Sequence, residues 1–182
     1  MIIGGVAGMA KSGMGSMAWV VVALMAVGNA SGRVVAGILS DKIGRANTLF
    51  IMMTAQAIVI FSLLFITPAQ IVLLVIAATL IGFNYGTNLS LFPSATKDFF
   101  GLKNFGVNYG LVFSAWGVGG FIFPRVSQMI VAYTQSPRMA YILAAGLLLL
   151  GAVLALMTKA PVAAVERETF IGIPIPEKMN VK

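Results

Sequence analysis

Residues 37–45 read GILSDKIGR, a short polar stretch between two long apolar segments. Gly37 permits close packing at the end of the preceding helix, and Gly44 permits a tight turn. Asp41 and Arg45 carry opposite charges four residues apart. We expect Asp41 to pair with Arg45 and to face the positive N-terminus of a neighbouring helix. The stretch therefore predicts an ion-paired turn between two helices.

Five long apolar segments surround this turn. Met17–Leu39 precedes it, and the others follow: Thr48–Ile66, Ile71–Phe92, Phe105–Tyr133 and Met139–Met157. A helix needs about 20 apolar residues to cross a bilayer, and each segment has that length. A membrane barrel would show alternating strands of about 10 residues, which these unbroken runs do not. The sequence predicts an all-α membrane protein whose spans occupy residues 17–157.

The composition also places these helices in a lipid bilayer. Apolar residues make up 59% of the chain and charged residues 9%, and mean hydropathy is +0.99. Soluble domains carry about 45–50% apolar and about 25% charged residues. The chain has no Cys and no His, which leaves out disulfides, thiolate metal sites and Cys or His nucleophiles. We expect no metal and no cofactor, and an enzyme is the least favoured class.

The net charge of +7 comes from 12 basic against 5 acidic residues. Because most basic residues fall in predicted loops and the tail, we interpret them as signals of orientation rather than as a nucleic-acid surface. One side of the predicted topology holds Lys42, Arg45, Lys97, Lys103 and Lys159. The other side holds Lys11 and Arg138. By the positive-inside rule, loops 40–47 and 93–104 and the tail 158–182 are expected in the cytoplasm, in a multi-pass protein of the cell (inner) membrane.

The first ten residues are apolar but too short to span a bilayer. They also lack the basic start of a signal peptide. We interpret residues 1–10 as the end of a truncated helix, and we expect the chain to be truncated or split.

Small residues recur at helical spacing in three predicted spans. The pairs are Gly28 and Gly32, Gly82 and Gly86, and Gly106 and Gly110. Such spacing lets two helix backbones approach closely. We expect these glycines to mark contacts between helices. They do not indicate which substrate the protein acts on.

The stretch 37–45 resembles the cytoplasmic signature loop of the major facilitator superfamily, Gly-x-x-x-Asp-x-x-Gly-Arg followed by basic residues. The resemblance implies a conformational latch made by Gly37, Asp41, Gly44 and Arg45. This latch would hold the cytoplasmic side closed and release it during transport. Ala46 and Asn47 stand where further basic residues are usual, which weakens the expected latch. The alternative is an ordinary charged turn.

Members of this superfamily have two six-helix halves, each with one such loop after its second helix. The first half usually carries an Arg early in its fourth helix, but Ile71–Phe92 has no charge. The chain also ends soon after its last span. Both features favour the C-terminal half, so residues 1–10 are interpreted as the end of helix 7 and residues 17–157 as helices 8–12. The expected partner is then a missing N-terminal half.

Three stretches resemble the oxalate/formate antiporter family more narrowly, with monocarboxylate porters as a weaker neighbour. They read NASGR at 29–33, FPS at 92–94 and FGLKNFGVNYGLVF at 100–113. The resemblance covers nearly the whole chain up to about Met157. It implies a secondary transporter for a small organic anion, working by alternating access.

Arg33 is the first candidate for a substrate ligand because it lies inside an apolar span. An Arg near the centre of a spanning helix costs about 2.5–3.5 kcal/mol on insertion scales, so it needs a partner or a water-filled cavity. No acidic residue falls inside the predicted spans. A carboxylate substrate fits the forked guanidinium, and in the antiporter family the matching Arg binds substrate. Asn29, four residues earlier on the same face, can bind the substrate or hold Arg33; snorkelling of Arg33 to the headgroups is the alternative.

Trp116 is an informative departure from the antiporter family, in which a Lys at this place pairs with the Arg to hold a dianion. One cation in place of two suits a monocarboxylate better. Tyr109 shares a face of the same span with Trp116, and Tyr85 and Asn88 lie in the span before it. We expect these residues to complete a small pocket beside Arg33, with plain helix packing as the alternative.

Two other functions remain open from the sequence. The chain can be an anion-sensing or regulatory membrane subunit derived from a transporter half, or a non-functional fragment. A reading frame that continues upstream with about six more spans favours transport.

Overall fold

The computed structural model describes residues 8, 11–12, 15–67 and 69–158. The predicted end of helix 7 at 1–10 lies outside these residues except for Gly8, and the tail 158–182 lies outside them except for Thr158. The described chain contains helices and no strand, which confirms the all-α prediction. Its elements are a 3-10 helix, η1 (Gly15–Ala18), and the α-helices α2 (Trp19–Ile43), α3 (Arg45–Ser62), α4 (Ile71–Phe100), α5 (Phe105–Thr134) and α6 (Arg138–Met157).

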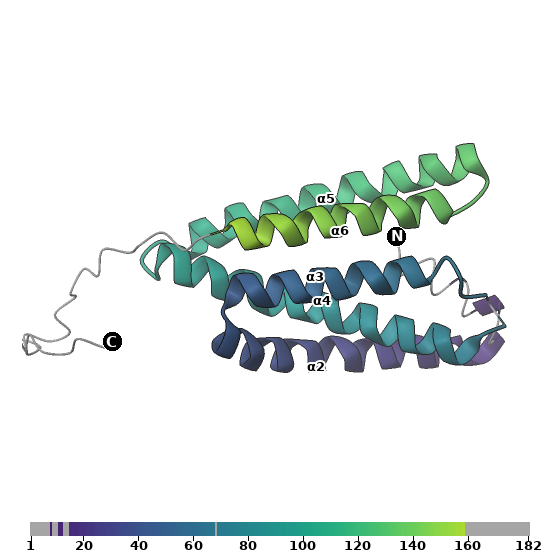
Figure 1. Ribbon diagram of the computed structural model, residues 1–182, viewed down its shortest axis with the longest axis horizontal. Coiled ribbons are helices and arrows are strands. Elements are labelled where there is room, and N and C mark those ends of the chain that lie inside the picture. Colours follow the sequence, from purple (N-terminus) through teal and green to yellow (C-terminus); the bar gives the residue numbers. More distant parts are fainter. Residues whose placement is uncertain (1–7, 9–10, 13–14, 68, 159–182) are drawn as a thin grey trace, which may run out of the picture.

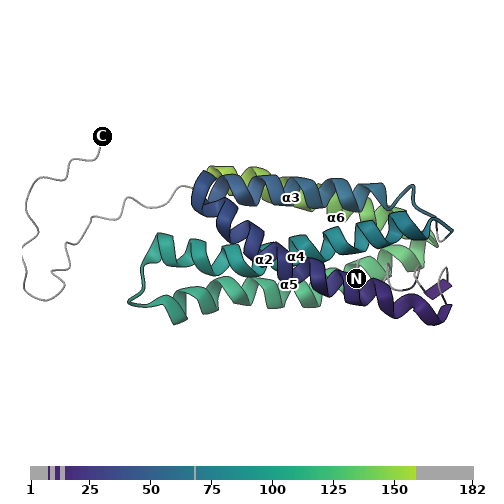
Figure 2. The ribbon, with the colours of Figure 1, turned by 90° about the horizontal axis from the view of Figure 1, so that it is seen from below.

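All five α-helices are long and apolar enough to cross a membrane. They run along one common direction as a bundle (Figures 1 and 2). The most extensive contacts join α2 to α4, followed by those between α3 and α6. A core of buried side chains from α2, α3, α4 and α6 includes Val21, Ile60, Leu74 and Tyr141. The structure thus confirms, within the described residues, five helices with the length and apolarity of membrane spans.

Glycines set the contact between α2 and α4. A Cβ at Gly28 or Gly32 would come closer than 3.0 Å to backbone atoms of α4, and a Cβ at Gly82 or Gly86 would do the same to backbone atoms of α2. The two glycine pairs therefore face each other. This confirms that both pairs mark a helix contact, and it allows backbone to touch backbone.

The predicted end of a span at Pro93 is wrong, because α4 continues through Pro93 to Phe100. The residue has no backbone N–H to donate, which breaks helices in water. The carbonyl oxygen that loses its donor is that of Leu89, four residues earlier. A helix in a membrane bundle tolerates such a Pro because its surroundings support the backbone. The Ser94 hydroxyl donates to the Ser90 carbonyl oxygen at 2.9 Å and the Thr96 hydroxyl to the Phe92 carbonyl oxygen at 2.8 Å, which adds bonds within the helix beside Pro93. The helix ends instead before Gly101, whose φ of 72° suits glycine.

The predicted loop 40–47 is also shorter than expected. Helix α2 extends to Ile43 and α3 begins at Arg45, so Gly44 alone separates them. Its φ of 88° lies in the region that only glycine adopts readily. The Thr48 hydroxyl and backbone N–H both bond the Gly44 carbonyl oxygen, at 2.9 and 3.2 Å. The sequence motif is therefore a sharp bend between two helices rather than a loop.

Candidate functional site

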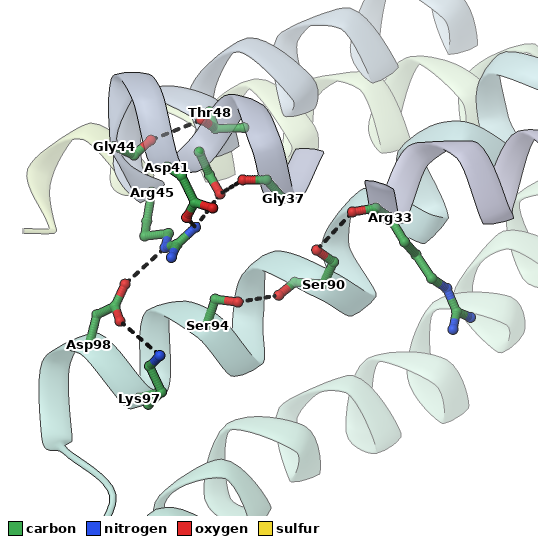
Figure 3. Close-up of polar contacts among 11 residues, drawn as sticks. Arg33, Gly37, Asp41, Gly44, Arg45, Thr48, Ser90, Ser94, Lys97 and Asp98 are labelled. Carbon is green, nitrogen blue, oxygen red and sulfur yellow. Dashed lines mark hydrogen bonds and ion pairs between the residues drawn. The ribbon is translucent and has the colours of Figure 1, made fainter. Parts of the chain in front are cut away.

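Arg45 lies at the centre of a charged cluster at the bend between α2 and α3 (Figure 3). Its Nη1 is 2.8 Å from Oδ1 of Asp41, the pairing that the sequence predicts. Its Nε is 2.8 Å from Oδ2 of Asp98 near the end of α4, and Nη1 also donates to the Ser40 hydroxyl. One guanidinium therefore ties together the end of α2, the start of α3 and the end of α4.

Asp98 is a member of this cluster that sequence reasoning missed. The predicted end of the span at Pro93 puts residue 98 in a loop. Since α4 continues for two more turns, Asp98 stands on a rigid helix opposite the bend. The sequence signal that could have placed Asp98 on the helix is its position one turn before Gly101, which ends the helix. The Arg45 side chain is only 19% exposed, against 67% for Asp41 and 36% for Asp98, so the Asp98 pair is the better shielded of the two.

Arg33 lies farther along α2, away from this cluster, and its side chain points away from the end of α4 (Figure 3). Its Nε donates to Oδ1 of Asn29 at 3.1 Å, which fits the expectation that Asn29 holds the Arg. The residue is exposed and makes no ion pair within the described residues. Its backbone carbonyl accepts a hydrogen bond from the Ser90 hydroxyl of α4 at 3.2 Å. The guanidinium thus retains unused donors on a surface open to a ligand or to another part of the protein.

A cavity of about 610 Å³ lies among α3, α4, α5 and α6. It is lined mostly by apolar side chains and includes three predicted site residues, Tyr85, Asn88 and Trp116. Arg33, Asn29 and Tyr109 are not among its lining residues. The reason is the geometry of α4, where Gly82 and Gly86 face α2 while Asn88 stands about 200° around the helix from Gly86. Helix α4 therefore separates two groups that we expected in one pocket.

Tyr109 belongs to an aromatic row along α5. Its ring stacks on Phe105, with centroids 5.6 Å apart, and contacts Phe113 at 5.7 Å. Phe113 in turn stacks on Trp116 at 5.1 Å. Of this row, Trp116 alone lines the cavity. The other rings of the row pack beside Trp116 and position it.

Five apolar spans, an ion-paired bend at one end and an Arg inside a span define a multi-pass membrane protein. Residues 2–174 match the sequence profile of the Major Facilitator Superfamily. The match covers almost the whole chain, so the chain belongs to that superfamily.

Two curated relatives agree with this family. An uncharacterized MFS-type transporter, YhjX, of Escherichia coli (strain K12) is 38% identical over 98 residues, which are 54% of this chain and 24% of the relative. The MFS transporter asaE of Aspergillus flavus is 32% identical over 120 residues, which are 66% of this chain and 27% of the relative. The chain thus matches about a quarter of the length of each of these relatives.

Proposed function

We propose that the chain is the C-terminal half of a secondary transporter for small organic anions, with a preference for monocarboxylates. One observation carries the proposal: Arg33 stands inside a span, its Nε held by Asn29 and no described acid paired with it. A guanidinium inside a membrane span needs an anion or water as a partner, and its remaining N–H groups suit a carboxylate. The two relatives named as transporters support the general class.

In this proposal an N-terminal half completes the site and the two halves alternate access to a midplane cavity. The cluster of Arg45, Asp41 and Asp98 acts as the latch at the cytoplasmic end. Ion pairs that cross three helix ends can form and break as rigid helices move against one another. Residues 40–47 and 93–104 and the tail then lie in the cytoplasm, and the protein resides in the inner membrane.

Anion exchange by reconstituted protein tests the Arg33 assignment. The protein encoded by the whole reading frame is placed in liposomes, and exchange of labelled formate or lactate is measured. Arg33→Lys keeps the charge but loses the fork, so exchange should fall at least about tenfold, as expected for the loss of a charged hydrogen bond of about 1.5–3 kcal/mol. Arg125→Lys is the matched control, because the Arg125 guanidinium of α5 lies over the Phe121 ring, 5.0 Å from its centroid. Exchange by this variant should stay near normal. Normal exchange by Arg33→Ala would remove Arg33 from the site.

Trp116 supports the preference for monocarboxylates, because it occupies the place where the related family has a second cation. A second anionic charge in a buried site needs a second cation or water. The unmodified protein should therefore exchange formate, lactate or pyruvate better than oxalate. Oxalate exchange as strong as that of formate would contradict this preference.

A further inference from the structure

The cavity among α3, α4, α5 and α6 is lined by three carboxamide side chains whose carbonyl oxygens receive no hydrogen bond from the described residues. They are Gln56 of α3 and Asn84 and Asn88 of α4, and all three line the cavity. Oε1 of Gln56, Oδ1 of Asn84 and Oδ1 of Asn88 are buried and have no hydrogen-bond partner within the described residues. A buried carbonyl oxygen without a donor costs about 1–3 kcal/mol, so three in one cavity require an explanation.

Asn84 gives the firmest observation of the three. Its side chain is only 4% exposed. Its Nδ2 donates to the Leu80 carbonyl oxygen at 3.1 Å, which fixes the amide and leaves Oδ1 as the unpaired atom. Rotating the amide by 180° would place two oxygens against each other. The orphan acceptor therefore follows from the hydrogen bond that Asn84 does make.

We propose that this cavity binds an uncharged, mostly apolar molecule that carries an O–H or N–H donor, such as an alcohol or a primary amide. Acceptor oxygens match a donor, and the apolar walls match a hydrocarbon body. The volume of about 610 Å³ lies within the range of about 300–1,000 Å³ typical of small-molecule sites. The site is separate from Arg33, which α4 divides from the cavity.

The walls argue against a charged occupant. No Asp, Glu, Lys or Arg is among the described residues that line the cavity. A cation held only by neutral amide oxygens, or an anion facing them, would lack a counter-charge in an apolar surrounding, and burying such a charge is costly. An uncharged donor satisfies the oxygens without that cost.

Trp116 lines the same cavity and supplies a fluorescent probe of its occupancy. The protein encoded by the whole reading frame is placed in lipid nanodiscs, and the emission of Trp116 is obtained by subtracting the spectrum of Trp116→Phe. Three brominated quenchers with the same eight-carbon chain are titrated: 8-bromo-1-octanol, its methyl ether and 8-bromooctanoate. The ether has the same body as the alcohol but only accepts hydrogen bonds, so it reports quenching from the lipid phase alone.

We expect saturable quenching by the alcohol with a half-saturating concentration at least about fivefold below that of the ether, in line with one net hydrogen bond or more. Asn84→Leu and Gln56→Leu should each reduce this advantage to less than about twofold. Thr54→Val is the matched control, because the Thr54 hydroxyl is also buried and unpartnered but Thr54 does not line the cavity. This control should keep the full advantage, and so should Arg33→Ala, since the site does not depend on the proposed anion ligand.

Three results would overturn the proposal. Equal quenching by alcohol and ether would mean that the oxygens are satisfied by water alone. Tighter binding of 8-bromooctanoate, lost in Arg33→Ala, would make the cavity part of the anion site. A change of Trp116 emission when sodium chloride replaces choline chloride, abolished by Asn84→Leu, would identify a cation as the occupant. The comparison of the three quenchers on the unsubstituted protein decides the matter even if a Leu variant does not fold.

Discussion

Helices α4 and α5 are equally long and both carry a pair of glycines four residues apart, yet the two pairs have different surroundings. Gly82 and Gly86 of α4 press against the backbone of α2. Gly106 and Gly110 of α5 have no described atom within 4 Å of the place where a Cβ would stand. In α4 ten residues are buried, whereas in α5 Ser127 alone is buried. The same spacing is a contact in one helix and an open face in the other.

The difference shows what a small-residue pair requires. Close approach of two helix backbones needs complementary small residues on both sides, and α2 supplies them opposite α4 through Gly28 and Gly32. No described helix supplies them opposite Gly106 and Gly110. In the proposed transporter, the open face of α5 is where the other half packs or where substrate passes.

The largest expected effect is on the contact between α2 and α4. Gly32→Leu should prevent its formation, because the new Cβ would lie closer than 3.0 Å to the backbone of Phe83, which cannot move aside like a side chain. Overpacking of a core typically costs about 1–3 kcal/mol, and we expect a loss at the upper end or beyond. Unfolding of the purified 182-residue chain in SDS, followed by circular dichroism, measures this change.

Gly110→Leu is the matched control on α5. In the 182-residue chain it should not destabilise, since the site is open and Leu is a better helix former than Gly by up to about 1 kcal/mol. In the proposed transporter, packing of another half on α5 would make the same change destabilising. Equal losses for Gly32→Leu and Gly110→Leu in the 182-residue chain would contradict the comparison.

The spans could be predicted from the sequence because lipid selects for length and apolarity, and these are local properties. The start of α5 at Phe105 and the end of α6 at Met157 are as predicted. The predicted end of α4 was wrong because Pro93 breaks helices in water, whereas a helix in a membrane bundle tolerates Pro and α4 continues to Phe100.

The sites were harder to predict because they depend on how helices face one another. The pairing of Arg45 with Asp41 is a contact within four residues and was predictable, but the pairing with Asp98 joins residues 53 apart. Gln56 was missed as a cavity residue for the same reason. Tyr85, Asn88 and Trp116 were expected beside Arg33, yet the rotation of α4 directs its glycines to α2 and its amides away from it.

A smaller effect is expected at the ion pairs through which Arg45 of α3 joins the ends of α2 and α4. In a double-mutant cycle of Arg45→Gln and Asp98→Asn, we expect a coupling of about 0.5–1 kcal/mol, the upper range for partly exposed pairs. The single changes should also make the bend between α2 and α3 more accessible to a protease or a thiol label. Lys97→Gln is the control, because its Nζ lies 4.0 Å from Asp98 on the same helix. Coupling indistinguishable from zero would leave the cluster without a role in holding these helices together.

The smallest expected effect concerns a single hydroxyl between α2 and α4. Ser90 Oγ donates to the Arg33 carbonyl oxygen of the facing helix at 3.2 Å. Hydrogen bonds between helices in membranes contribute about 0.6 kcal/mol on average, since the separated helices also find partners in the bilayer. Ser90→Ala should therefore lower the free energy of unfolding by about that amount.

In contrast, Ser114 Oγ of α5 donates to the Leu111 carbonyl oxygen of its own helix at 2.7 Å. Ser114→Ala therefore removes no contact between helices and should change the free energy of unfolding by less than about 0.3 kcal/mol. A larger loss for Ser114→Ala than for Ser90→Ala would mean that α5 is the better-anchored helix, because a hydroxyl that bonds only its own helix can matter that much only where another segment packs against it.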